Sequence, residues 1–127
     1  MLHVFLVFIG GGLGAAGRHL VGIAALRQFG PNFPYGTLIV NVVGSLLMGL
    51  LIGWLVRRGI STSNELRLFL ATGVLGGFTT FSAFSLDIAN LWEKGALLPA
   101  ASYALSTVVI CIISVFIGLW IARNLGT

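Results

Sequence analysis

The residues best suited to do chemistry in this chain are gathered in one uncharged stretch, GGFTTFSAFS (Gly76–Ser85). The stretch opens with two glycines and then alternates phenylalanines with serines and threonines. Glycine weakens a helix interior by about 1 kcal/mol per residue, and Ser and Thr offer the backbone competing hydrogen bonds. We therefore predict a helix that breaks near Gly76–Thr80, where freed backbone carbonyls could bind a cation.

Beyond the predicted break, Phe81 and Phe84 lie three positions apart, so both rings would occupy one face of a helix. Ser82 and Ser85 would form a neighbouring stripe of hydroxyls. Paired phenylalanines ordinarily pack in a core, and spacing alone favours that role. The edge of an aromatic ring is its positive pole, however, so rings presented edge-on can attract a small anion without a formal charge.

Two further stretches place polar side chains at intervals of four residues, which puts them on one face of a helix. They are Thr37, Asn41 and Ser45 in one stretch and Tyr103, Thr107 and Cys111 in the other. A single Ser or Thr hydroxyl is best explained by a bond to its own backbone or to a neighbouring helix. The Asn41 amide cannot be satisfied by its own helix, so we expect it in a wet cavity or against a partner. The stripes together predict an aqueous path.

Residue sets typical of enzymes and metal centres are not apparent. None of the three acids, Glu65, Asp87 and Glu93, lies inside a long apolar run, which disfavours a carboxylate proton relay. His3 and His19 have no partners at metal-ligand spacing. The sequence leaves the role of Asp87 open between an ion pair with a nearby cation, Arg18 or Lys94, and a position near the membrane surface. We therefore predict a protein that is not an enzyme.

One glycine motif imitates a nucleotide site. Gly12–Gly17 (GLGAAG) matches the dinucleotide fingerprint, but that fingerprint needs a preceding strand and an acid about 20 residues further on. Neither is present. The spacing of Gly10 and Gly14, and of Gly49 and Gly53, is instead typical of faces where two membrane helices pack closely.

The elements that must position these residues are membrane helices. Of the 127 residues, 57% are hydrophobic and 8% are charged, against about 25% charged in soluble domains. Spanning the hydrocarbon core takes about 20 helical residues, and four stretches suffice: about 2–26, 37–56, 63–91 and 96–122. The third follows a capping-box pattern at Thr62–Glu65. We predict an all-α membrane protein with a single domain over residues 1–127, whose first span is retained because no cationic leader precedes it.

The cations near the ends of the spans scarcely favour one orientation. If the spans alternate, one side of the membrane receives Arg57, Arg58, Arg67 and Arg123, and the other receives Arg18, Arg27 and Lys94. The positive-inside rule needs an imbalance to set a direction. The chain is therefore expected to insert both ways and to pair as an antiparallel homodimer. Cations placed this way are typical of contacts with membrane lipid, and they form no basic stripe for nucleic acid.

At this point the sequence resembles a known family, the Fluc-type fluoride channels, also called CrcB proteins. The strongest pieces are GxLGGxTTFSxFS at Gly73–Ser85 and GTLxxNxxG at Gly36–Gly44. The glycine cluster that ends in an arginine, Gly10–Arg18, and Tyr103 in the fourth span support it. The resemblance covers the whole chain and implies an antiparallel dual-topology homodimer with two fluoride pores, each lined by both subunits.

The resemblance also implies roles for particular residues. The pore-lining set comprises the two rings, the amide, and the hydroxyls beside them: Phe81, Phe84, Asn41, Ser82, Ser85, Tyr103 and Thr107. Arg18, expected near a helix end, corresponds to a cation in the vestibule. Backbone carbonyls of Gly76 and Thr79 from both subunits correspond to a structural sodium site at the dimer interface. The sequence departs from the family at Ala83, where many members have Thr, and at Thr107, where Ser is expected.

The implied function is passive export of fluoride across the bacterial inner membrane, down its electrochemical gradient and without a coupled ion. The alternative is a small dual-topology multidrug exporter. That class depends on a carboxylate embedded in the first span, and residues 1–26 contain no acid. A third alternative, a non-conducting assembly subunit, would account for the glycines but not for Asn41 with the alternation of Phe and Ser.

Overall fold

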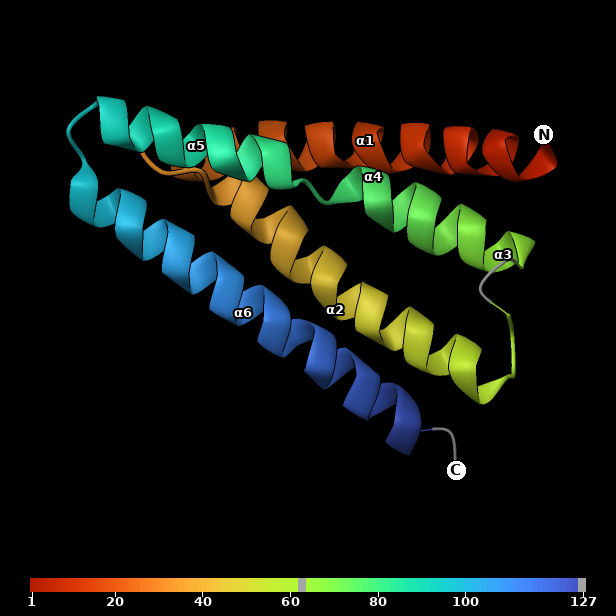
Figure 1. Ribbon diagram of the computed structural model, residues 1–127. Helices are drawn as coiled ribbons and strands as arrows, with labels where there is room; N and C mark the ends of the chain where they lie inside the picture. Colours follow the sequence, from red (N-terminus) through yellow and green to blue (C-terminus); the bar gives the residue numbers. More distant parts are fainter. Residues whose placement is uncertain (62–63, 126–127) are drawn as a thin grey trace.

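The structure is a computed structural model that describes residues 1–61 and 64–125, and every element in this part of the chain is helical (Figure 1). The elements are α1 (Leu2–Phe29), α2 (Tyr35–Arg57), α3 (Glu65–Arg67), η1 (Leu68–Leu75), α4 (Gly76–Phe78), α5 (Phe81–Glu93) and α6 (Leu97–Asn124). Elements α3 to α5 together form the third span, and all four spans are long and apolar enough to cross a membrane. The predicted all-helical membrane architecture is confirmed.

The ends of the helices differ by a few residues from the predicted ones. α1 continues to Phe29 and stops at Gly30, whose φ of 80° is a left-handed conformation that suits glycine. The third span begins at Glu65, and its N-cap is Asn64, whose side chain accepts a 2.8 Å hydrogen bond from the Leu66 N–H. The predicted capping box starts at Thr62, which lies outside the described residues. The cap that the structure contains is therefore the asparagine.

The third span is interrupted between α4 and α5, inside the range that the sequence predicted. Thr79 and Thr80 have extended backbones, with φ/ψ of −92°/160° and −155°/125°. The Thr80 hydroxyl then caps α5 by accepting a 3.1 Å hydrogen bond from the Ala83 N–H. Before the break, η1 is wound as a π-helix, a form that is rare and frequently found at functional sites.

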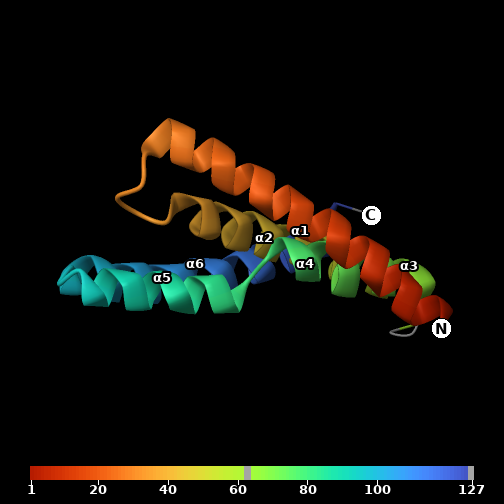
Figure 2. The same cartoon turned by 90° about the horizontal axis from the view of Figure 1, so that it is seen from above.

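The two halves of the third span pack against different neighbours. Before the break, η1 and α4 lie along α1, and after it α5 lies along α6 (Figures 1 and 2). Figure 2 shows that α5 and the C-terminal half of α1 diverge on either side of α2. The break thus lies where the bundle opens, and the cavities described below are lined from this region.

Glycines bring helix backbones into contact at two interfaces, as the sequence predicted. A Cβ at Gly14 would collide with the Val74 carbonyl oxygen, so α1 can approach the third span only with glycine there. Likewise a Cβ at Gly49 would collide with the Val115 carbonyl oxygen of α6, and one at Gly53 with the Ala122 methyl group. These contacts fix α2 against α6 and α1 against η1, the two largest helix interfaces.

One cation is not where the sequence placed it. α1 continues beyond the predicted end to Phe29, so Arg18 lies further from the helix end than the sequence suggested, and its Nε donates a 3.1 Å hydrogen bond to the Gly77 carbonyl oxygen. Without Arg18, only Arg27 and Lys94 remain near the span ends on that side. The charge balance therefore favours insertion in both orientations less than the sequence suggested.

Candidate functional site

Asn41 holds the broken third helix to α2. Its Nδ2 donates a 3.0 Å hydrogen bond to the Thr80 carbonyl oxygen, and its Oδ1 accepts a 2.8 Å bond from the Thr80 N–H. One amide therefore satisfies both backbone groups of a residue that the break removed from helical bonding. An asparagine amide has two N–H donors, so one remains for another partner. The sequence predicted a cavity or a partner for Asn41, and the structure gives it both.

A cavity of about 220 Å³ opens beside this clamp. Its lining combines amide, hydroxyl, thiol and aromatic groups from α2, the break, α5 and α6. The lining residues are Asn41, Ser45, Thr79, Thr80, Phe81, Phe84, Thr107, Val108 and Cys111. Two residues of each polar stripe that the sequence placed on α2 and α6 therefore meet across one cavity, whereas Thr37 and Tyr103 do not line it.

Thr107 adds to this cavity a buried hydroxyl whose hydrogen bonding is incomplete. It is 3% exposed, and its Oγ1 has no hydrogen-bond partner among the described residues. By contrast, Ser106 and Ser114 on the same helix donate to the carbonyl oxygens of Ser102 and Ile110. A hydroxyl buried without a partner costs about 1–3 kcal/mol. The wall of the cavity therefore includes a residue whose buried hydroxyl has no protein partner in the described part of the chain.

The two phenylalanines line the same cavity but differ in exposure. Phe81 is 76% exposed, whereas Phe84 is 4% exposed and belongs to the buried cluster that contains Tyr103. Their ring centroids are 5.6 Å apart with planes at 55°, and Phe84 lies 5.1 Å from the Tyr103 ring. These tilted rings turn edges towards their neighbours and do not stack flat. One ring is fixed by its own chain, and the other is free to contact a second molecule.

Arg18 lines a second cavity of about 360 Å³ between α1, α2 and the break. Thr80 belongs to the walls of both this cavity and the first, so the two adjoin. The guanidinium is partly buried and held by the Gly77 carbonyl oxygen, which fixes its charge beside the cavity. A single cation here would raise the local concentration of anions.

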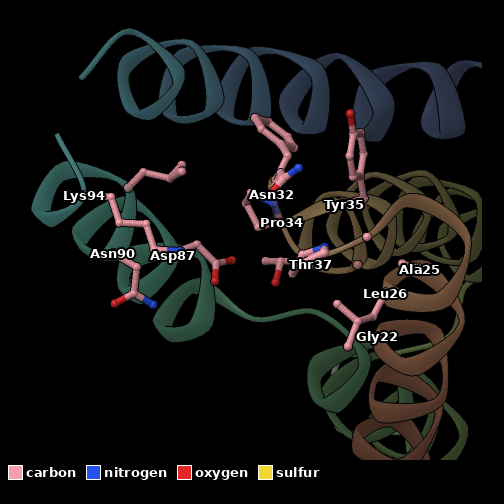
Figure 3. Close-up of a pocket in the computed structure, with 15 residues that line it drawn as sticks. Gly22, Ala25, Leu26, Asn32, Pro34, Tyr35, Thr37, Asp87, Asn90 and Lys94 are labelled. Carbon is pink, nitrogen blue, oxygen red and sulfur yellow. The ribbon is translucent and has the colours of Figure 1, made fainter. Parts of the chain in front are cut away.

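A third cavity, of about 310 Å³, lies towards the end of the bundle where α1 joins α2 (Figure 3). Figure 3 shows Asp87 on α5 facing Thr37 on α2 across it. Thr37 also lines the Arg18 cavity, so all three cavities are neighbours. The Asp87 carboxyl accepts a 3.0 Å hydrogen bond from the Tyr103 hydroxyl. Within this chain, the partner of Asp87 is therefore a tyrosine and not Arg18 or Lys94.

Comparison with known proteins places this arrangement in a family. The family model described as "CrcB-like protein, Camphor Resistance (CrcB)" matches residues 5–119. A protein of Mesorhizobium japonicum named "Fluoride-specific ion channel FluC" is 60% identical over 125 residues, which is 98% of this chain and 99% of that protein. The chain belongs to the CrcB family. Proteins of the same printed name from Chelativorans sp. and Agrobacterium fabrum are 56% and 55% identical over the same shares.

Within this CrcB chain, the residues that the resemblance implies as pore-lining fall into three groups. Asn41, Phe81, Phe84 and Thr107 line the 220 Å³ cavity. Tyr103 is fully buried and bonded to Asp87 at the third cavity. The remaining two, Ser82 and Ser85, are exposed on α5.

The hydroxyls of these two serines have partners close by in sequence. Ser82 Oγ lies 3.2 Å from Thr80 Oγ1, and Ser85 Oγ donates a 2.9 Å hydrogen bond to the Phe81 carbonyl oxygen. Ser85 therefore does what a serine in a membrane helix ordinarily does: its hydroxyl bonds to a carbonyl oxygen of its own helix. Ala83, the departure from the family pattern, lines the Arg18 cavity without a hydroxyl.

Two residues make contacts in the site that were not predicted from the sequence. Thr80 is the backbone partner of Asn41 and the N-cap of α5, and Thr37 faces Asp87. The two threonines that follow Gly76–Phe78 could have indicated an N-cap for α5, because threonine is a common N-cap residue. Its pairing with Asn41 spans 39 positions, and no spacing rule predicts such a contact.

Proposed function

We propose that this chain is a fluoride-selective channel that lets fluoride leave the cell passively, down its electrochemical gradient. The family membership and the name that the relatives carry support this proposal. The observation that carries it in the structure is the cavity at the break, where Asn41 keeps one N–H donor and Thr107 keeps a free hydroxyl.

Fluoride is small and strongly hydrated, so its entry into a membrane requires substitutes for water. The idealised cost of moving even a larger, carboxylate-sized ion into a medium of low dielectric constant is about 20 kcal/mol. The free N–H of Asn41, the Thr107 hydroxyl and the ring edges of Phe81 and Phe84 provide neutral donors that can replace a hydration shell. Neutral donors also allow the ion to leave, because a fixed cation among them would hold it.

The driving force for export is the membrane potential. A negative cell interior is worth about 2.3 kcal/mol per elementary charge per 100 mV, and it pushes an anion outwards. Arg18, beside the adjoining cavity, would gather fluoride at the entrance without lying among the neutral donors. No nucleotide hydrolysis and no coupled ion is needed for this direction of flow.

The functional unit in this proposal is an antiparallel homodimer of dual topology in the inner membrane. Phe81 is 76% exposed although its ring lines the cavity, and Ser82 and Ser85 face outwards beside it. A second copy packed on this face would cover the ring and close the open side of the cavity. Each pore would then be built from both subunits.

A structural sodium ion at the dimer interface fits the chemistry of the break. The Thr80 N–H, which in an unbroken helix would donate to the Gly76 carbonyl, donates instead to Asn41. The Ala83 N–H, which would donate to the Thr79 carbonyl, donates to the Thr80 hydroxyl. Both carbonyl oxygens have thus lost their helical donors, and unwound carbonyls of this kind coordinate Na⁺ in membrane proteins. Gly76 and Thr79 would hold the ion, which would staple the subunits together and would not be transported.

The deciding experiment is ion efflux from liposomes that contain the purified protein. We expect rapid fluoride efflux, measured with a fluoride electrode, and chloride efflux at least a hundredfold slower. Equal rates for the two ions, or no fluoride flux from a folded protein, would disprove the proposal. A tag on the C-terminus should be accessible from both sides of the membrane, and access from one side alone would contradict dual topology.

The pore assignment has its own test in two exposed phenylalanines. Phe81→Ile removes a ring edge from the cavity wall, whereas Phe8→Ile changes a ring on α1 that is equally exposed, 74% against 76%, and lines none of the cavities described. We expect at least a tenfold lower fluoride flux for Phe81→Ile and no change for Phe8→Ile. Equal flux from both variants would remove Phe81 from the pore. The double variant Phe81→Ile with Asn41→Ala should pass no measurable fluoride while still dimerising.

A further inference from the structure

An apolar groove of about 380 Å³ lies between α2 and η1, and it shares no lining residue with the three cavities described above. It lies between two packed pairs of helices, since α2 packs mainly on α6 and η1 on α1. Its walls are formed by apolar side chains, among them Leu47, Leu51 and Trp54 on α2 and Leu70 and Leu75 on η1. From Leu47 to Trp54 the groove follows α2 over about 10 Å, the rise of seven residues, towards the C-terminal end of that helix. Its length and lining suit a hydrocarbon chain.

The end of the groove near the C-terminus of α2 carries a positive charge. Trp54 lines the groove, and the Arg58 guanidinium lies over its ring, 5.3 Å from the ring centroid. A guanidinium that stacks on a ring through its flat face still has N–H groups at its edge to donate to a phosphate. On the opposite wall, Arg67 precedes Leu70 by one turn. Tryptophan and arginine are the residues that membrane proteins place at the level of the lipid headgroups.

The two ends of the bundle differ in charge. Where α2 and α6 finish and the third span begins (Figure 1), the Lys, Arg, Asp and Glu side chains are four arginines and one acid: Arg57, Arg58, Arg67, Arg123 and Glu65. At the opposite end they are two cations and two acids: Arg27, Lys94, Asp87 and Glu93. A second copy in the proposed antiparallel dimer would bring its balanced end to the arginines, and a parallel copy would bring further arginines. Neither neutralises the charge at the end of the groove, whereas an anionic lipid headgroup does.

We propose that the groove binds an anionic phospholipid of the surrounding membrane, with one acyl chain between α2 and η1 and the phosphate on Arg58. Basic sites between membrane helices bind the headgroups of anionic lipids. The acyl chain fills the space along Trp54 and the leucines, which would otherwise lack contacts on one side. The site does not depend on fluoride transport, because it shares no lining residue with the proposed pore.

Native mass spectrometry of the purified, delipidated protein counts the lipid molecules that each chain binds during a titration. The two probes are phosphatidylglycerol, whose headgroup is anionic, and phosphatidylcholine with the same acyl chains, whose headgroup has no net charge. We expect one tightly bound phosphatidylglycerol per chain. Its affinity should exceed that of phosphatidylcholine by about tenfold, the effect of one to two arginines beside an anionic headgroup.

Three variants locate the lipid. Arg58→Gln should reduce the preference for phosphatidylglycerol to about twofold, because the charge beside the phosphate is lost. Arg27→Gln is the matched control: it removes an equally charged, exposed side chain from the opposite end of the bundle and should keep the full preference. Leu51→Phe narrows the groove without a change in charge, and should weaken phosphatidylglycerol binding about fourfold, the effect of displacing one methylene group.

Each part of the proposal can fail separately. Equal affinity of the wild type for the two lipids would overturn it. An equal loss of preference in Arg58→Gln and Arg27→Gln would overturn it as well, because net charge and not the groove would then select the lipid. Unchanged lipid affinity in Leu51→Phe would place the lipid outside the groove. If that variant also loses its dimer in size-exclusion chromatography, the groove is occupied by a second copy of this chain instead.

Discussion

The sharpest consequence of the structure concerns Asn41, which performs two tasks with one amide. Asn41→Ala removes both hydrogen bonds to the Thr80 backbone and, from a side chain that lines the cavity, the remaining N–H donor. The change should therefore lower both the stability of the fold and the fluoride flux. A residue that only contacted the ion would lower flux alone.

The loss of stability can be worked out from the two bonds, at 3.0 and 2.8 Å. Hydrogen bonds between membrane helices contribute about 0.6 kcal/mol on average and about 1.7 at most. Each bond to the Thr80 backbone should contribute close to the upper value, because the break gives the Thr80 N–H and C=O no helical partner. Water from the cavity would replace part of what is lost. We expect about 2 kcal/mol for the pair, which is a shift of roughly 30-fold in the folding equilibrium.

The assay is reversible unfolding of the purified protein in detergent, with fluoride efflux from liposomes as the second measurement. Asn41→Asp is the matched variant, because it keeps an oxygen for the Thr80 N–H and loses the donor to the Thr80 carbonyl. It should lose about half as much free energy of unfolding as Asn41→Ala. It should also pass almost no fluoride, since a carboxylate in the cavity would repel the anion. If Asn41→Ala unfolds like the wild type, the clamp contributes nothing and the reasoning is refuted. If it conducts like the wild type, Asn41 is not part of the pore.

The remaining predictions use the same measurements. Thr107→Val removes a buried hydroxyl without a protein partner among the described residues, so the free energy of unfolding should rise, by about 1–3 kcal/mol at most, while fluoride flux falls several-fold; a clear loss of stability would show that the hydroxyl has a partner. Gly14→Ala places a methyl group on the Val74 carbonyl oxygen and should cost about 1–3 kcal/mol, whereas Gly12→Ala meets open space and should be neutral or slightly stabilising; equal effects would argue against close packing of α1. Tyr103→Phe keeps the ring but loses the bond to Asp87, and should cost about 1–2 kcal/mol; an unchanged unfolding curve would contradict that bond. Replacing Na⁺ by a large organic cation should weaken the dimer, seen by size-exclusion chromatography, and unchanged dimerisation would count against the sodium site.

The sequence alone determined that this is a membrane protein and where its third helix breaks. Both follow from local physics. The low charge and the long apolar runs leave lipid as the only suitable environment, and glycines followed by two threonines weaken a helix wherever they occur. The close glycine contacts were also predictable, because a spacing of four brings small residues to one face.

Tertiary structure decided which groups meet. That Asn41 pairs with Thr80, that Asp87 bonds to Tyr103 rather than to a cation, and that Arg18 bonds to the Gly77 carbonyl oxygen all depend on how the spans pack. Spacing along one helix fixes which side chains share a face, but not which face of another helix lies opposite. That choice is made by the glycine contacts and by the exchange of neighbours at the break, and both join residues far apart in the chain.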